Sequence, residues 1–156
     1  MRRIAWALLA IGGGHLLSPR LQAGDPGVRA WFIGGTVAEL SPKTEGRIDL
    51  TDGDSFLIRG KAVSLTVPYR NINVLEYGQH VSRRYAEAIL ISPVLLLAKS
   101  RKHFITLGFT DAGGKQQAVV LRVNKNDIRS VLAALEARTG RRVEYQDDEA
   151  RKSGKG

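Results

Sequence analysis

Alternation of apolar and polar residues is the dominant pattern of this 156-residue chain between about residues 30 and 123. A period of two places every second side chain on the same face, which is typical of β-strands with one buried face. The clearest example runs from Val63 to Tyr69. Residues typical of tight turns separate several stretches, as in Thr51–Asp54 and Asp111–Gly114. The pattern predicts seven strands, at about 30–40, 45–51, 54–60, 63–69, 71–77, 105–109 and 119–123.

The period changes after residue 126. Apolar residues at positions i, i+3, i+4 and i+7 predict one amphipathic helix, with a stripe formed by Ile128, Val131, Leu132 and Leu135. Asn124 or Asn126 is a candidate N-cap, and Gly140 is a candidate C-cap. Residues 141–146 predict a short extended piece, and the charged residues 147–156 predict a disordered tail.

Strands followed by one terminal helix indicate the fold class. Elements with one apolar face are stable when they bury it against another layer. We therefore expect a mainly β domain with a C-terminal α-helix, built as a strongly bent antiparallel sheet or a partly open barrel. The chain shows no internal repeat and no long linker, so we assign one domain to residues 29–146.

An apolar segment interrupts the strand pattern. Residues 86–98 are mostly apolar, and Ser92-Pro93 is a typical helix start. The segment is shorter than the roughly 20 residues that cross a bilayer. One interpretation is an extra core helix near 82–100. The other is a membrane or partner contact within 83–103, formed by Arg83, Arg84, Val94, Leu95, Leu96, Leu97, Lys99, Arg101 and Lys102. Burying a leucine contributes roughly 1.5–3 kcal/mol in either setting, so burial energy leaves both interpretations open.

The N-terminus has the features of a secretory signal. Arg2 and Arg3 precede the mostly apolar residues 4–17, Pro19 follows, and Ala23 offers a small residue for cleavage. We expect a signal peptide at 1–23 and a protein exported to the periplasm. The alternatives are an uncleaved anchor and a cytosolic protein with an apolar arm.

The net charge and the cysteine content limit the binding partners and the kinds of site that this protein can have. Removal of residues 1–23 leaves 133 residues and lowers the net charge from +9 to +6, because that segment holds three arginines and no acid. A basic chain favours anionic partners, here an anionic lipid surface or another envelope protein. Export disfavours nucleic acid, and no transmembrane span is predicted in the mature chain. The sequence has no cysteine, which excludes disulfides, zinc–thiolate sites and thiol nucleophiles.

Several stretches carry a resemblance to a known family. Thr66–Ile72, Glu76–Gly78, the hairpin at His103–Val123 and the helix end at Leu135–Gly140 resemble those of bacterial pleckstrin-homology-like and GRAM-like domains. The resemblance covers about residues 30–145. It implies a binding or scaffolding module, often at membranes, without catalysis.

No ligand-binding residue of this family can be assigned to a position of this chain. Phosphoinositide-binding members carry a basic signature between their first two strands. Here the corresponding residues 41–47 contain two cations, Lys43 and Arg47, together with the acid Glu45. The chain therefore departs from the signature at this place.

Candidate reaction chemistry is sparse. Thr51–Ser55 resembles the beginning of a calcium loop, but its twelfth position counted from Asp52 is Val63, so we favour a turn. His80 and His103 show no metal-ligand spacing, and no nucleophile elbow is present. No cofactor is predicted.

These patterns lead to one expected function and two alternatives. We expect a non-catalytic binding or scaffolding module of the cell envelope, peripheral on an anionic membrane through residues 83–103. One alternative is a protein–protein interaction domain with 86–98 in its core. The other is a small envelope hydrolase, which requires a concave pocket that holds a histidine and a carboxylate.

Overall fold

One sheet and two helices account for most of the described chain. The computed structural model describes residues 27–81 and 102–155. A short 3-10 helix, η1 (Tyr69–Asn71), joins two strands, and the α-helices are α3 (Ile128–Thr139) and α4 (Asp148–Lys155). The strands are β1 (Val28–Gly35), β2 (Glu45–Asp49), β3 (Ser55–Arg59), β4 (Ser64–Pro68), β5 (Ile72–Gly78), β6 (His103–Thr110), β7 (Gln116–Val123) and β8 (Glu144–Tyr145).

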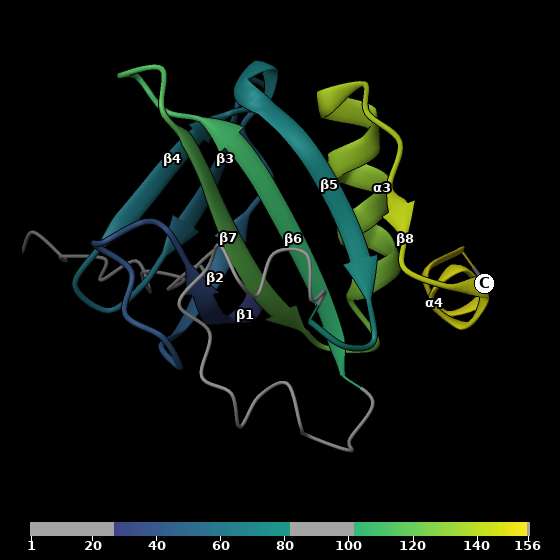
Figure 1. The fold of residues 1–156 in the computed structure, drawn as a ribbon. Helices are drawn as coiled ribbons and strands as arrows, with labels where there is room; N and C mark the ends of the chain where they lie inside the picture. The colour runs from purple at the N-terminus through teal and green to yellow at the C-terminus, as the bar shows by residue number, and fades with distance from the viewer. Residues whose placement is uncertain (1–26, 82–101, 156) are drawn as a thin grey trace, which may run out of the picture.

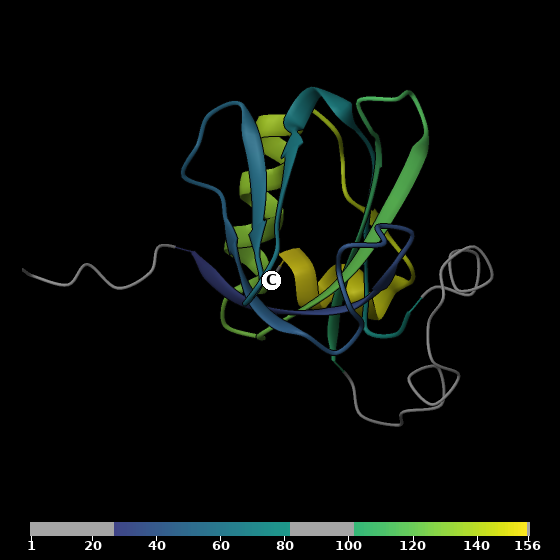
Figure 2. The same cartoon turned by 90° about the vertical axis from the view of Figure 1, so that its left-hand side faces the viewer.

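The strands form a single open sheet in the order β4-β3-β2-β1-β7-β6-β5-β8. Neighbouring strands from β4 to β5 pair antiparallel, whereas β8 pairs parallel with β5. The sheet bends strongly (Figures 1 and 2), and α3 contacts η1 and α4. The predicted mainly β fold with a C-terminal helix is confirmed. Each of β1 to β7 overlaps one predicted strand, although β1 ends at Gly35 and its predicted strand extended to residue 40.

The core lies between the concave face of the sheet and α3. The four stripe residues predicted for α3 are each at most 2% exposed. From the sheet they meet large buried side chains, which include Phe56, Tyr77 and Leu107. Gly140 ends α3 with a left-handed backbone (φ 66°), which glycine adopts without steric cost. The predicted C-cap is thus confirmed.

The C-terminal tail differs from the prediction. Disorder was expected over 147–156, but Asp148–Lys155 forms α4, so that prediction is wrong for these residues. Asp147 caps the helix, since its Oδ1 accepts the Ala150 N–H at 2.6 Å. Ala150 is fully buried, and Gly154 lies so close to Tyr145 that an added Cβ would be 2.6 Å from its ring. Packing of two small residues against the domain therefore stabilises this charged helix.

Several predictions fall outside the described residues. These are the signal peptide at 1–23, the apolar helical segment near 82–100 and the contact residues 83–101. Within the two described ranges, neither helix is long and apolar enough to cross a membrane.

Candidate functional site

Three arginines from neighbouring strands lie side by side on one face of the sheet. In the β1–β2 register Arg29 is opposite Arg47, and in the β2–β3 register Arg47 is opposite Arg59. Residues that are directly opposite have Cβ atoms about 5 Å apart. Their sequence neighbours Ala30, Ile48 and Ile58 belong to the hydrophobic core. Because side chains alternate along a strand, the three arginines lie on the outer face.

These arginines line an open groove of about 740 Å³, which we call the arginine groove. Lys43 and Lys61 add two further cations at its rim, and Glu45 is the one acid in its lining. The other lining residues are Thr44, Gly46 and Gly60. Five cations and one carboxylate around one groove create a positive potential that attracts anions.

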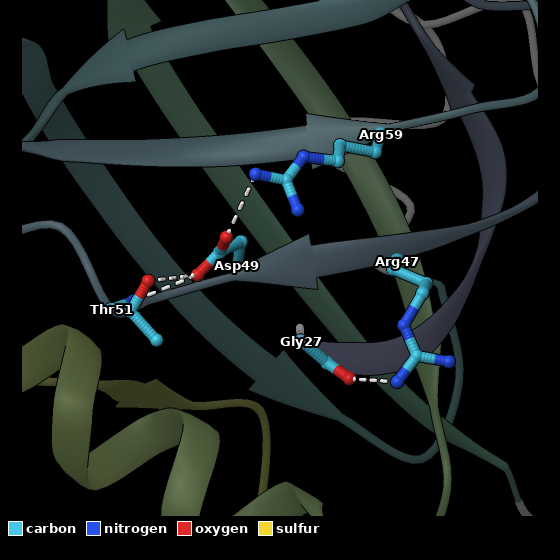
Figure 3. Close-up of polar contacts among 5 residues, drawn as sticks. All are labelled: Gly27, Arg47, Asp49, Thr51 and Arg59. Atoms are coloured by element: carbon cyan, nitrogen blue, oxygen red, sulfur yellow. Dashed lines mark hydrogen bonds and ion pairs between the residues drawn. The ribbon is translucent and has the colours of Figure 1, made fainter. Parts of the chain in front are cut away.

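Two of the arginines have carboxylate partners of different exposure. Arg29 Nε lies 3.1 Å from Glu45 Oε1, and both side chains are more than half exposed. Arg59 Nη2 lies 3.1 Å from Asp49 Oδ2, whose side chain is only 7% exposed. Figure 3 shows Asp49 facing Arg59 from the adjacent strand. Exposed ion pairs contribute only about 0.2–1 kcal/mol, so the Arg29 pair exchanges easily with another anion.

Asp49 is held in its ionised form. Its Oδ1 accepts hydrogen bonds from the Thr51 hydroxyl at 2.6 Å and the Thr51 backbone N–H at 2.9 Å (Figure 3). These bonds lower the pKa of Asp49 below its usual value, and the charges of Arg59 and Arg138 act in the same direction, against the effect of burial. Asp49 therefore keeps the Arg59 guanidinium oriented at neutral pH.

Arg47 has no carboxylate among the contacts described here. One Nη of Arg47 donates to the Gly27 carbonyl, and the guanidinium is turned toward Gly27 in Figure 3. Its Nε is buried and has no hydrogen-bond partner among the described residues. A buried donor without an acceptor is unfavourable by about 1–3 kcal/mol. The central arginine therefore keeps one buried donor without a partner among the described residues.

A glycine keeps β2 and β3 close beneath these side chains. A Cβ at Gly46 would lie 2.3 Å from the Arg59 carbonyl oxygen, so another residue here requires a backbone shift. A small apolar cavity shares lining residues with the groove and reaches the core residues Phe32, Ile58 and Leu121. This cavity measures about 10 Å³, which is room for about one water molecule.

Lys102 is the one predicted contact residue within the described ranges. It borders a second, smaller cavity of about 320 Å³ with Trp31, Arg122 and Lys125. The Arg122 guanidinium carbon lies 4.1 Å from the centroid of the Trp31 ring, a cation–π contact. The structure thus groups Lys102 with two cations and an aromatic side chain, and Trp31 shares β1 with Arg29 of the arginine groove.

The two histidines occupy different settings. His80 is exposed, whereas His103 begins β6, and its Nδ1 lies 2.6 Å from the Tyr77 hydroxyl oxygen. Burial lowers the pKa of His103, and the charge of Lys125 acts in the same direction. The cavity that His103 borders is lined by three cations and no carboxylate within the described residues. Within the described residues, this cavity holds a histidine and no carboxylate.

The Thr51–Ser55 stretch is a hydrogen-bonded turn. Asp52 Oδ1 accepts the backbone N–H groups of Asp54 at 2.8 Å and Ser55 at 2.7 Å. This is the local bonding typical of aspartate in turns, which confirms the predicted turn. Across residues 27–81 and 102–155, no three potential His, Cys, Asp or Glu ligands gather into a metal site.

None of the five cations of the arginine groove was predicted as a site residue. Arg29, Arg59 and Lys61 come from separate stretches of the sequence, and only strand pairing brings them to Lys43 and Arg47. Alternation places Arg47 and Arg59 on the polar faces of their strands, which is a usable signal. Alternation does not predict the strand register, which is what places the arginines opposite one another.

Comparison with known proteins assigns this chain to no family. Neither protein-family models nor curated protein sequences match the chain.

Proposed function

We propose that this protein is a non-catalytic binding module that associates with anionic membrane surfaces through the arginine groove. The observation that carries the proposal is the line of Arg29, Arg47 and Arg59 across three adjacent strands. Like charges directly opposite one another destabilise a sheet. A bound anion removes this repulsion, so the groove favours an occupied state.

The chemistry of the groove suits a phosphate group. A guanidinium group presents paired N–H donors that match two oxygens of a phosphate. Arg47 lies between the other two arginines, and its partner is a neutral carbonyl group. A phosphate in the groove would lie against a lining that includes all three arginines, and the exposed Arg29–Glu45 pair opens at little energetic cost.

The wider chain supports the same function. The net charge is +9 for the whole sequence and +6 without residues 1–23, and either value favours a negatively charged surface. The apolar and basic segment 83–103 is the proposed second contact, and the signal-like N-terminus supports a location in the periplasm. The resemblance to pleckstrin-homology-like and GRAM-like domains agrees with a binding or scaffolding role without catalysis.

The test is co-sedimentation of the full chain with phosphatidylglycerol-containing vesicles, with phosphatidylcholine vesicles as the reference. We expect binding to the anionic vesicles in excess of the reference, and this excess should decrease at high salt. One cation near an anionic surface contributes about 1 kcal/mol, or roughly fivefold in affinity. The double variant Arg29→Gln/Lys61→Gln should therefore weaken the excess binding about 25-fold.

A variant of equal charge serves as the control. Lys115 and Lys152 are exposed and lie outside the arginine groove, so Lys115→Gln/Lys152→Gln should weaken binding less than threefold. Arg47→Lys keeps the charge but loses the forked donors, and we expect it to weaken binding too. Equal loss in both double variants would show general charge attraction and overturn the assignment to the groove. Salt-insensitive binding, or none, would overturn the proposed function.

A further inference from the structure

A second basic groove lies on the opposite side of the domain. It measures about 860 Å³ and lies between the end of α3, β8 and α4. We call it the C-terminal groove. Four cations from these elements and the loop between them line it, namely Arg141, Arg142, Arg151 and Lys155. The sheet order places β8 at the far edge from β4 and β3, and Figure 1 shows α3, β8 and α4 together on that side.

The cations of this groove are arranged around an aromatic side chain. Arg151 and Lys155 lie 6.0 and 5.6 Å from the centroid of the Tyr145 ring, within cation–π range. The Tyr145 ring packs edge-on against Tyr77, which is fully buried. The Tyr145 ring is therefore held in place by contact with the core.

A third cation is fixed by the backbone. Arg141 Nε donates to the Ile72 carbonyl oxygen at 2.7 Å, which holds its guanidinium group at the start of β5. Arg142 follows it and is exposed. Cations held in place lose less conformational entropy when they bind a carboxylate, so a built groove binds better than mobile surface lysines.

Two acids in the lining indicate the kind of partner. Glu136 Oε1 accepts the Val143 N–H at 2.8 Å, and Glu144 lies in β8. A continuous polyanion would meet repulsion at both acids. A peptide whose carboxylates are separated by neutral residues can place its carboxylates next to the cations. Its neutral residues can then lie next to Glu136 and Glu144, which avoids the repulsion. We infer that the C-terminal groove binds an acidic, extended segment of a partner protein, as a site independent of the arginine groove.

The test is fluorescence anisotropy with a fluorescein-labelled (Glu-Ala)5 peptide and the full chain at physiological salt. The (Lys-Ala)5 peptide is the reference. We expect saturable binding of the acidic peptide alone. Arg142→Gln/Arg151→Gln should weaken it about tenfold, whereas Arg142→Lys/Arg151→Lys should keep it within threefold.

Two variants of equal charge separate this site from general attraction. Lys115→Gln/Lys152→Gln and the arginine-groove variant Arg29→Gln/Lys61→Gln should both bind the peptide within twofold of the unchanged protein. Circular dichroism and thermal unfolding verify that each variant is folded. Absence of acidic-peptide binding, or equal weakening in all three glutamine variants, would overturn the inference. So would loss of phosphatidylglycerol binding in Arg142→Gln/Arg151→Gln with unchanged peptide binding, which would assign this groove to the membrane.

Discussion

The Tyr77 hydroxyl oxygen and His103 Nδ1 lie 2.6 Å apart, and the two rings are parallel within 6°. Tyr77 belongs to β5 and His103 begins β6, so this contact joins adjacent strands at the end where α4 docks. A neutral imidazole with its proton on Nε2 accepts this hydrogen bond from the tyrosine. The pair therefore depends on the protonation state of His103.

The first prediction concerns pH. Burial lowers the pKa of His103 below its ordinary value of 6.5, so the unfolded chain takes up this proton first as the pH falls. The contribution to stability is complete above pH 6.5 and decreases from there toward the lower pKa of the folded state. Urea unfolding at pH 8 and pH 5 should show a larger loss of stability in the unchanged protein than in His103→Gln. An equal loss would contradict the prediction.

A second prediction tests the energetic coupling of this pair. Tyr77→Phe removes the hydroxyl and leaves Nδ1 without its partner, which should lower the free energy of unfolding by about 1–3 kcal/mol. In the double variant with His103→Gln, the two losses should not add, because each single change already breaks the same hydrogen bond. Urea unfolding of all four proteins measures the coupling. Additive losses would show that the contact contributes little.

A third prediction concerns the packing of α4. An added Cβ at Gly154 would lie 2.6 Å from Tyr145 and 3.2 Å from Tyr77. We expect Gly154→Ala to destabilise the docked helix by about 1–3 kcal/mol through overpacking. Faster amide hydrogen exchange in residues 148–155 should report it. Gly53→Ala is the matched control, because nothing lies within 4 Å of its added Cβ. Equal exchange in the two variants would contradict the role of Gly154.

The fourth prediction separates stability from binding in the arginine groove. Asp49→Asn removes the charge that pairs with Arg59 and weakens the bonds from Thr51. Thermal unfolding should therefore occur at a lower temperature. Binding to anionic vesicles should become roughly fivefold tighter, because the Asp49 carboxylate no longer competes with lipid phosphates for Arg59. A variant that is destabilised and also binds more weakly would show that Asp49 holds the groove in its binding geometry.

The fifth prediction addresses the apolar segment, which lies outside the described residues. If residues 83–103 contact a membrane or a partner, Leu96→Asp should abolish that binding and retain the fold. An aspartate inserted into apolar surroundings is costly in either setting, so folding is the deciding measurement. Circular dichroism of the variant separates the interpretations. If Leu96→Asp unfolds the domain, the segment belongs to the core.

The periodic parts of the fold were predictable from the sequence. Alternation from Val63 to Tyr69 predicted β4 because one face of that strand is buried, and the stripe from Ile128 to Leu135 predicted α3 for the same reason. Helix α4 was not predictable in this way. Its buried residues, Ala150 and Gly154, are small, and Gly154 packs against Tyr145 and against Tyr77, which is 77 positions away in the sequence.

The candidate site was predictable only in its parts. Lys43 and Arg47 were noted as the two cations between the first two strands, too few for a phosphate-binding signature. Arg29 and Arg59 complete the groove through strand register, which depends on bulges and turns as well as on apolar pattern. A site assembled across strands therefore needs the structure.

The position of β1 between β2 and β7 has a consequence for how the protein folds. Ala30 pairs with Val123, which is 93 positions further along the chain. Contacts between distant residues form late, because a long loop must close before they stabilise anything. A growing chain cannot join the two halves of its sheet until β7 has been synthesised. Until then β1 lacks its second neighbour and exposes an unpaired strand edge.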